Sequence, residues 1–316
     1  MQGHAQCVQL LLENNADINV KDAHGKTPLH YATDRQNNPC VKYLIDSKAS
    51  LNIADNTGKT PLHHAISTRK NNYAQLLVDN KAEIHSVDSE GKNLLHYAVN
   101  LKDFELLCCL LSLGIDKNTQ DMYGMTPLHW AIRSRQLKLA ETLLQKGTKV
   151  NLQDNAGRTP LHFASCNGTT QSIIMLTNYA AWINAQDKKK QTPLHYAVQF
   201  GHIEDVAELI KQKVALDPQD DHGRTPLHYA VVAKKLDCVN ALVAAGAATH
   251  PVDQDGKTPE NLVRLVSQDE GWILADPCAD RVNEELENRQ ARVRSVLDKP
   301  LAGINEILNI VNGYVD

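Results

Sequence analysis

The chain has 316 residues, a net charge of −4 at pH 7, 42% hydrophobic residues and 5% aromatic residues. The apolar content is enough for an ordered core, and a charge this close to neutral disfavours a nucleic-acid binder. No apolar run approaches the ~20 residues that span a bilayer, the N-terminus shows no signal-peptide pattern, and the cysteines include no CxxC or Cys/His spacing for zinc. We therefore expect an intracellular protein of the cytoplasm, with the nucleus as a second location, and no membrane insertion.

The elements predicted along the chain follow a fixed period of 33 residues. Asn93 begins a variant of the repeated phrase, and Thr258 begins a shortened copy. The full phrase Thr-Pro-Leu-His begins at Thr27, Thr60, Thr126, Thr159, Thr192 and Thr225. A fixed period of this size indicates one supersecondary unit repeated many times, rather than a single globular enzyme core.

Each copy predicts a turn followed by two helices. An Asp lies five residues before the Thr, and a Gly lies two residues before it in every copy but one, which is turn chemistry. Lys190 replaces that Gly, so we expect an altered or strained turn there. The Thr suits an N-cap and the Pro suits the first helical position, while a Leu seventeen residues after the Thr marks the second helix. We interpret four cysteines as residues of this core: Cys7, Cys40, Cys109 and Cys238.

The copies divide the chain into segments. Residues 1–21 match only the second half of a unit. Seven full units follow at 22–54, 55–87, 88–120, 121–153, 154–186, 187–219 and 220–252. Residues 253–271 form a degenerate unit, and residues 272–316 predict a C-terminal helical cap or extension. The half unit suggests a fragment of a longer chain, with a natural start as the alternative.

The period and its pattern Asp-x-x-Gly-x-Thr-Pro-Leu-His-x-Ala resemble the ankyrin repeat family over about residues 1–265. The resemblance implies an all-α solenoid of helix-turn-helix units with β-turn fingers, here followed by the C-terminal helical cap. It also implies a non-catalytic scaffold that binds a partner protein through its concave face and finger loops, without a cofactor. Two alternatives stay open: a targeting module of a larger enzyme or effector whose catalytic domain lies outside this chain, and a scaffold that self-associates through residues 279–316.

The histidine of each phrase invites a catalytic or metal-binding interpretation. A catalytic site needs unlike residues that converge once, whereas this column repeats one geometry at His30, His63, His96, His129, His162, His195 and His228. The resemblance implies that these histidines tie adjacent loops together. Because GxxxxGK[ST], GxGxxG and GxSxG are also absent, we expect no catalytic, cofactor or metal residues in the chain.

Candidate partner-binding residues lie where the period does not dictate the residue. The position after the histidine is mostly aromatic, and it either packs between first helices or supplies anchors at a concave face. From this position and the rest of the same helix we select His64, Tyr97, Phe163, Tyr196 and Phe200. A second group combines an apolar finger with a following aromatic and basic helix: Met122, Tyr123, Met125, Trp130, Arg133 and Arg135. The alternative to partner binding is that its methionines only pack on neighbouring fingers.

Two smaller signals complete the candidates. Lys188, Lys189 and Lys190 form the only basic cluster in a finger, either a solvated tip or a contact for an acidic partner, with nucleic acid the least favoured ligand. Asn19 and Asn151 resemble ankyrin asparagines that factor inhibiting HIF hydroxylates in animals. The alternative is a purely structural asparagine, which is common at this place in the fold.

Overall fold

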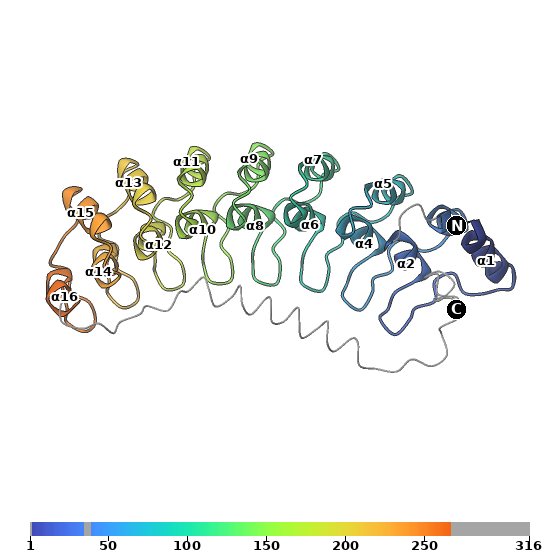
Figure 1. The fold of residues 1–316 in the computed structure, drawn as a ribbon, viewed down its shortest axis with the longest axis horizontal. Helices are drawn as coiled ribbons and strands as arrows, with labels where there is room; N and C mark the ends of the chain where they lie inside the picture. Colours follow the sequence, from blue (N-terminus) through green and yellow to red (C-terminus); the bar gives the residue numbers. More distant parts are fainter. Residues whose placement is uncertain (1, 35–38, 267–316) are drawn as a thin grey trace. The chain divides into compact units, whose positions relative to one another are not determined.

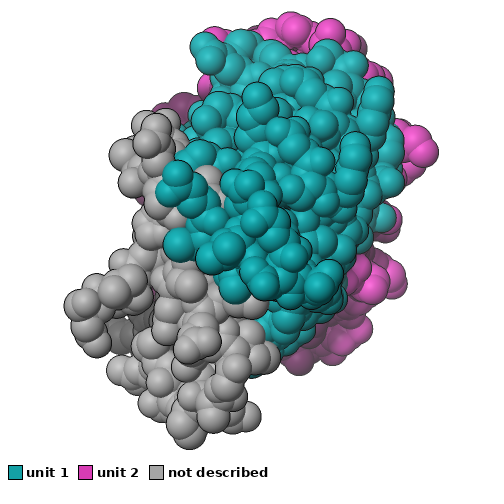
Figure 2. Space-filling view, turned by 90° about the vertical axis from the view of Figure 1, so that its right-hand side faces the viewer, with its two compact units in different colours: residues 1–122, 291–316 teal, residues 123–290 magenta. Residues whose placement is uncertain are grey.

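The computed structural model describes residues 2–34 and 39–266, and their regular secondary structure is helical throughout (Figure 1). No strand occurs in these residues, and none of their helices has the length and apolar character to cross a bilayer. The predicted cap at 272–316 and the self-association segment 279–316 lie outside the described residues. The described residues form two compact units, one up to residue 122 and one from residue 123 onward (Figure 2).

In the first unit, first and second helices alternate along the chain. The first helices are α2 (Pro28–Asp34), α4 (Pro61–Ser67) and α6 (Leu94–Leu101). The second helices are α1 (Gln2–Glu13), α3 (Pro39–Asp46), α5 (Asn71–Asp79) and α7 (Phe104–Ser112). The first helices pack in the order α2, α4, α6, and each also packs on the second helix of its own copy.

The second unit repeats this arrangement. Its first helices are α8 (Pro127–Arg133), α10 (Pro160–Asn167), α12 (Pro193–Phe200), α14 (Pro226–Val232) and α16 (Pro259–Val266). Its second helices are α9 (Leu137–Gln145), α11 (Thr170–Asn178), α13 (Ile203–Lys211) and α15 (Leu236–Ala244). Within this unit the first helices form one row, the second helices form another, and the finger loops extend below the first row in Figure 1.

Local chemistry explains why each first helix begins where it does. Thr126 is the N-cap of α8, and its hydroxyl accepts a bond from the His129 N–H while its own N–H donates to His129 Nδ1. This reciprocal bonding satisfies donors that a helix start leaves without partners. In the shortened copy Asn261 replaces the histidine, and its Oδ1 accepts from the Thr258 hydroxyl at 2.9 Å. The N-cap of α16 is therefore kept although this copy has Glu260-Asn261 in place of Leu-His.

The cores of the units are built from the leucine and alanine columns. Leu128, Leu161 and Leu194 of the phrase and Leu143 and Leu176 of the second helices are all 0% exposed. Each such side chain contributes roughly 1.5–3 kcal/mol when buried. Of the cysteines assigned to this core, Cys40 and Cys238 are buried as predicted.

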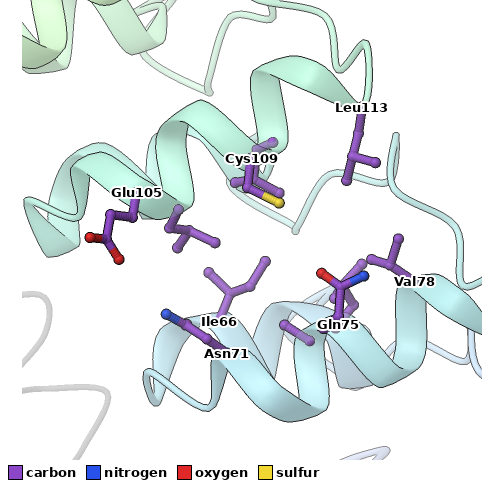
Figure 3. Close-up of a pocket in the computed structure, with 11 residues that line it drawn as sticks. Ile66, Asn71, Gln75, Val78, Glu105, Cys109 and Leu113 are labelled. Carbon is purple, nitrogen blue, oxygen red and sulfur yellow. The ribbon is translucent and has the colours of Figure 1, made fainter.

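The same prediction was wrong for two other cysteines. Cys7 is exposed on α1, for which the sequence of its copy supplies no first helix. Cys109 is exposed because it faces a cleft of about 180 Å³ between α5 and α7. Figure 3 shows Ile66, Val78 and Leu113 in the same cleft.

Candidate functional site

Each finger is held in shape by the aspartate at its start. In the finger at 187–191, Asp187 Oδ1 accepts from the N–H groups of Lys189 and Gln191, both at 2.8 Å. The Asp187 N–H donates to the Gln191 carbonyl at 2.9 Å, which closes the loop. The same two-donor clamp recurs at Asp22, Asp55, Asp88, Asp154, Asp220 and Asp253. The backbone of this fingertip is thus held by bonds of its own main-chain N–H and carbonyl groups.

Lys190 shows how the turn tolerates the loss of glycine. Its N–H still donates to the Asp187 carbonyl at 3.0 Å. Its φ is 57°, whereas the equivalent Gly157 and Gly223 have φ of 82° and 74°. A φ near 57° is the centre of the left-handed region open to a residue with a Cβ. The expected alteration is therefore a shift in φ with the hydrogen bonds kept.

In five copies the second oxygen of the clamping aspartate bonds the side chain that follows the histidine. The Tyr196 hydroxyl donates to Asp187 Oδ2 at 2.9 Å. Three further hydroxyls do the same at 2.6 Å: Tyr31 to Asp22, Tyr97 to Asp88 and Tyr229 to Asp220. These aromatic residues brace the fingers against the first helices. Burial is accordingly high for His64, Phe163 and Tyr196, which are 8%, 6% and 3% exposed.

Two copies build this brace from other residues. Phe163 has no hydroxyl, and Arg158 takes its place, donating from Nε and Nη2 to Asp154 Oδ2 at 2.9 and 2.7 Å while its guanidinium lies 4.4 Å from the Phe163 ring centre. His64 donates from Nε2 to Asp55 Oδ2 at 2.8 Å. Burial acts to raise the pKa of Asp55, but hydrogen bonds from His64 and the finger outweigh it and lower that pKa to about 2.

The histidine column joins successive copies. His129 Nδ1 accepts the Thr126 N–H at 3.1 Å, and because an amide N–H can only donate, the proton of the neutral ring lies on Nε2. That Nε2 donates to the Arg158 carbonyl at 3.2 Å. Equivalent bonds join His30, His162, His195 and His228 to the carbonyls 29 residues later. Burial lowers the pKa of His30, His129, His162 and His195 to about 4, so these rings are neutral structural links.

One cluster has the residue types of a metal site. The ligand atoms of His30, Asp55 and His64 lie within 4.8 Å of one another, and all three residues are buried. The Thr27 N–H donates to His30 Nδ1 at 3.0 Å, which places the ring proton on Nε2, and that proton is donated to the Lys59 carbonyl. His64 Nε2 is bonded to Asp55 Oδ2. These bonds already use the atoms that a metal would need, so we assign the cluster to the finger brace.

The predicted apolar finger is divided by the fold. Met122 is 51% exposed in the first unit, and the remaining members belong to the second unit. Met125 and Trp130 are 2% and 9% exposed and lie in the core. Tyr123 is half-buried.

Basic side chains and one further aromatic complete the predicted positions. Arg133 and Phe200 are half-buried, and exposed Arg135 donates from Nη2 to the Asn167 carbonyl of the next copy. Three consecutive lysines are exposed at one fingertip: Lys188, Lys189 and Lys190. Of these, Lys190 forms an ion pair with Asp221 of the next finger, with 3.5 Å between Nζ and Oδ1.

The two predicted hydroxylation positions share a structural role. Asn151 Oδ1 accepts from the Trp182 N–H at 2.8 Å, and its Nδ2 donates to the Ala180 carbonyl at 3.1 Å. Asn19 Oδ1 accepts from the Ser50 N–H at 2.8 Å. The same link between loops is made by Asn52, Asn184 and Asp217. Hydroxylation stays a prediction, at side chains that also join copies.

Sequence reasoning missed the most exposed aromatic residue among the described residues of the second unit. Trp182 is 63% exposed in the loop after α11. The equivalent position elsewhere holds Ser50, Glu83, Asp116, Lys149, Ala215 and Ala248. The signal in the sequence is a tryptophan at a repeat position that otherwise holds polar or small residues.

Comparisons with known proteins agree with this architecture. The family model described as ankyrin repeats (3 copies) matches five overlapping stretches, residues 1–88, 73–154, 95–187, 147–220 and 173–255. Among solved structures, the ankyrin repeat domain of Bcl-3, described as a unique member of the IkappaB protein family, is similar with 28% identity and a TM-score of 0.62. That similarity covers 69% of this chain and 99% of that one. A comparison with curated proteins gave no match.

Proposed function

The chain belongs to the ankyrin repeat family, and on that premise we propose that it is a non-catalytic scaffold that binds a partner protein through its finger loops and first helices. The fingers favour this role because hydrogen bonds within and between copies hold their backbones. A surface that is ordered before binding loses little conformational entropy on association. The repeat boundaries given above are our proposal for its domain organisation.

The basic fingertip of the second unit is the observation that carries the proposal. Lys188 and Lys189 project from a loop clamped by Asp187. The neighbouring fingers also hold this loop, because the Lys188 N–H donates to the Ala156 carbonyl at 2.9 Å and the Lys189 carbonyl accepts from the Asp221 N–H at 3.0 Å. A rigid group of ammonium ions suits carboxylates of a partner and steers their approach.

Three further candidates add accessible side chains in the second unit. Tyr123, Arg133 and Phe200 are half-buried and keep part of their side chains accessible. In the first unit, the exposed Met122 is a separate apolar contact. The buried members Met125, Trp130, Phe163 and Tyr196 act by holding the fingers and first helices in place.

Affinity capture from cells tests this proposal. The bait is the full chain, compared with a Lys188→Glu/Lys189→Glu variant. Lys81→Glu/Lys234→Glu is the matched control, since those lysines are also exposed and lie outside the finger tips. We expect the captured partner to be lost with the first variant, retained with the control, and weakened by raised salt. Equal capture by all three proteins would refute the fingertip assignment.

The two alternative functions rest on sequence outside the described residues. A targeting role within a larger enzyme or effector needs a catalytic domain beyond this chain. Self-association needs residues 279–316, and comparing the mass in solution of the full chain with that of a chain ending at residue 278 tests it. A monomer in both cases would exclude that scaffold.

A further inference from the structure

The second helix of the copy at 154–186 differs in composition from its neighbours. Residues 168–186, which include α11 and the loop after it, contain no Asp, Glu, Lys or Arg. The flanking helices α9 and α13, which pack on either side of α11, both carry acidic and basic residues. Charge depletion is what separates the centre of a protein interface from ordinary surface.

Apolar and aromatic groups occupy this uncharged stretch. Trp182 and Tyr179 are 63% and 38% exposed, and Ile174 and Met175 are half-buried beside exposed Gln171 and Asn178. We call these six residues the α11 surface. Tryptophan, tyrosine and methionine are the types enriched where proteins bind one another. A fold that needs only a small or polar residue at position 182 does not account for an exposed indole there.

The loop holds Trp182 in a fixed position. Its N–H donates to Asn151 Oδ1 at 2.8 Å, and its carbonyl accepts from the Ala185 N–H at 3.0 Å. The Ala181 N–H donates to the Leu176 carbonyl at 3.0 Å, which ties the loop to the end of α11. A partner would therefore have to order the indole side chain and not the backbone.

The rim of this surface is mostly basic. The loop after α9 carries exposed Lys146 and Lys149, and the end of α13 carries exposed Lys211 and Lys213. Lys211 is paired with Glu208 at 3.3 Å. The other acids near these helix ends are Glu141 and Asp217, and Asp217 Oδ1 already accepts from the Ala248 N–H. The bond from the Ala248 N–H leaves the charge of Asp217 in place, so four lysines lie near three acids and the rim carries a small net positive charge.

We propose that the α11 surface is a second protein-binding surface, for a segment of another protein that carries an apolar anchor residue flanked by acidic residues. The anchor packs on Trp182 and Tyr179, and its acidic flanks meet the lysines of the rim. A second copy of this chain is a poor occupant, because packing α11 on α11 across a two-fold axis brings one lysine rim against the other. In Figure 1 the row of second helices lies away from the finger loops of this unit, so the α11 surface and the fingers can act separately.

Random twelve-residue peptides displayed on phage are the probe for this surface. They are selected on the immobilised full chain after removal of peptides that bind a Trp182→Asp variant. That substitution introduces the residue type found at Asp116, so it preserves the fold, which circular dichroism verifies. We expect the recovered peptides to contain an apolar residue flanked by Asp or Glu. Their synthetic copies should bind the wild-type chain at least tenfold more tightly than the Trp182→Asp variant.

Two control variants define the surface. Lys146→Glu/Lys149→Glu should weaken the peptides at least threefold, whereas Leu236→Asp, which changes a 69% exposed residue on α15, should leave affinity unchanged. Peptides without acidic residues, or with equal affinity for the Trp182→Asp variant, would overturn the proposal.

A footprinting measurement distinguishes the other occupants. Hydroxyl-radical labelling of the free full chain should modify Trp182 strongly, as expected for an indole open to solvent. Protection of Trp182 in a monomeric chain would assign the surface to another segment of the same chain. Protection that appears only as protein concentration rises would assign it to a second copy. Either result would overturn the proposal.

Discussion

Replacing Gly157 by Ala isolates the contact that joins one finger to the next. Gly157 has a φ of 82°, and a Cβ built on it would lie 2.6 Å from the Lys188 backbone nitrogen. That nitrogen cannot retreat freely, because its N–H donates to the Ala156 carbonyl at 2.9 Å. Gly157→Ala therefore combines an unfavourable φ with a collision between the new Cβ and the backbone of the next finger.

The size of the effect follows from two contributions. A left-handed residue with a Cβ costs about 1–2 kcal/mol, and the lower entropy of the unfolded alanine chain offsets about 0.4–1 kcal/mol of it. Relieving the collision adds about 1–3 kcal/mol, as in other overpacked sites. We expect Gly157→Ala to destabilise the second unit by about 1–4.5 kcal/mol, with a central value of about 3 kcal/mol.

Gly256→Ala is the matched control, because Gly256 has a φ of 72° and no atom of residues 2–34 and 39–266 lies within 4 Å of its built Cβ. It should destabilise the chain by only about 1 kcal/mol, from φ alone. Urea unfolding followed by circular dichroism, together with hydrogen exchange of the amides at 187–191, measures both effects. If the two variants lose the same stability, the contact between fingers contributes nothing and our reasoning is wrong.

Three further predictions concern the histidines and two carboxylates. The buried phrase histidines have folded pKa values of about 4, below the unfolded value of 6.5, so their contribution to stability is complete above pH 6.5 and is lost as the pH falls toward 4. Free energies of unfolding from urea titrations at pH 7 and pH 5 should differ by on the order of 1–2 kcal/mol per histidine. Arg158→Ala should destabilise the chain by about 3 kcal/mol, because it leaves the buried Asp154 Oδ2 without its two hydrogen bonds from the guanidinium. Adding Phe163→Tyr should recover part of that loss, because the tyrosine hydroxyl can take the place of Arg158. Additive effects of the two substitutions would disprove this replacement. Burial raises the pKa of Asp205, which is 1% exposed, so its stabilising effect is present at low pH and lost as the pH rises through the folded pKa. Asp205→Asn should therefore stabilise the chain by about 1 kcal/mol at pH 7 and flatten the dependence of stability on pH. A loss of stability in this variant at pH 7 would contradict the prediction.

The sequence predicts those parts of the fold that short spacings determine. Thr126, Pro127 and His129 form their cap within four residues, so one copy of the phrase defines the start of α8. The turn at Lys190 is local in the same way, and its altered φ follows from the missing glycine.

The candidate site is less predictable because its residues depend on longer contacts. An aromatic residue after the histidine can be an anchor or a brace, and the difference is the bond from Tyr196 to Asp187, nine residues earlier. Arg158 and Phe163 form a pair that becomes visible only when their side chains are placed. Trp182 lies in the loop after a second helix, outside the fingers and first helices where the repeat pattern predicts a binding surface.

The finger clamp also bears on how such a protein changes over generations. The aspartate bonds the amide groups of the tip residues, and every residue except proline supplies the same amide. Substitutions at positions such as Lys188 and Lys189 can therefore accumulate without loss of the amide bonds that hold the loop. Binding specificity can then change one side chain at a time, while the aspartates and histidines that hold the fingers stay necessary for folding.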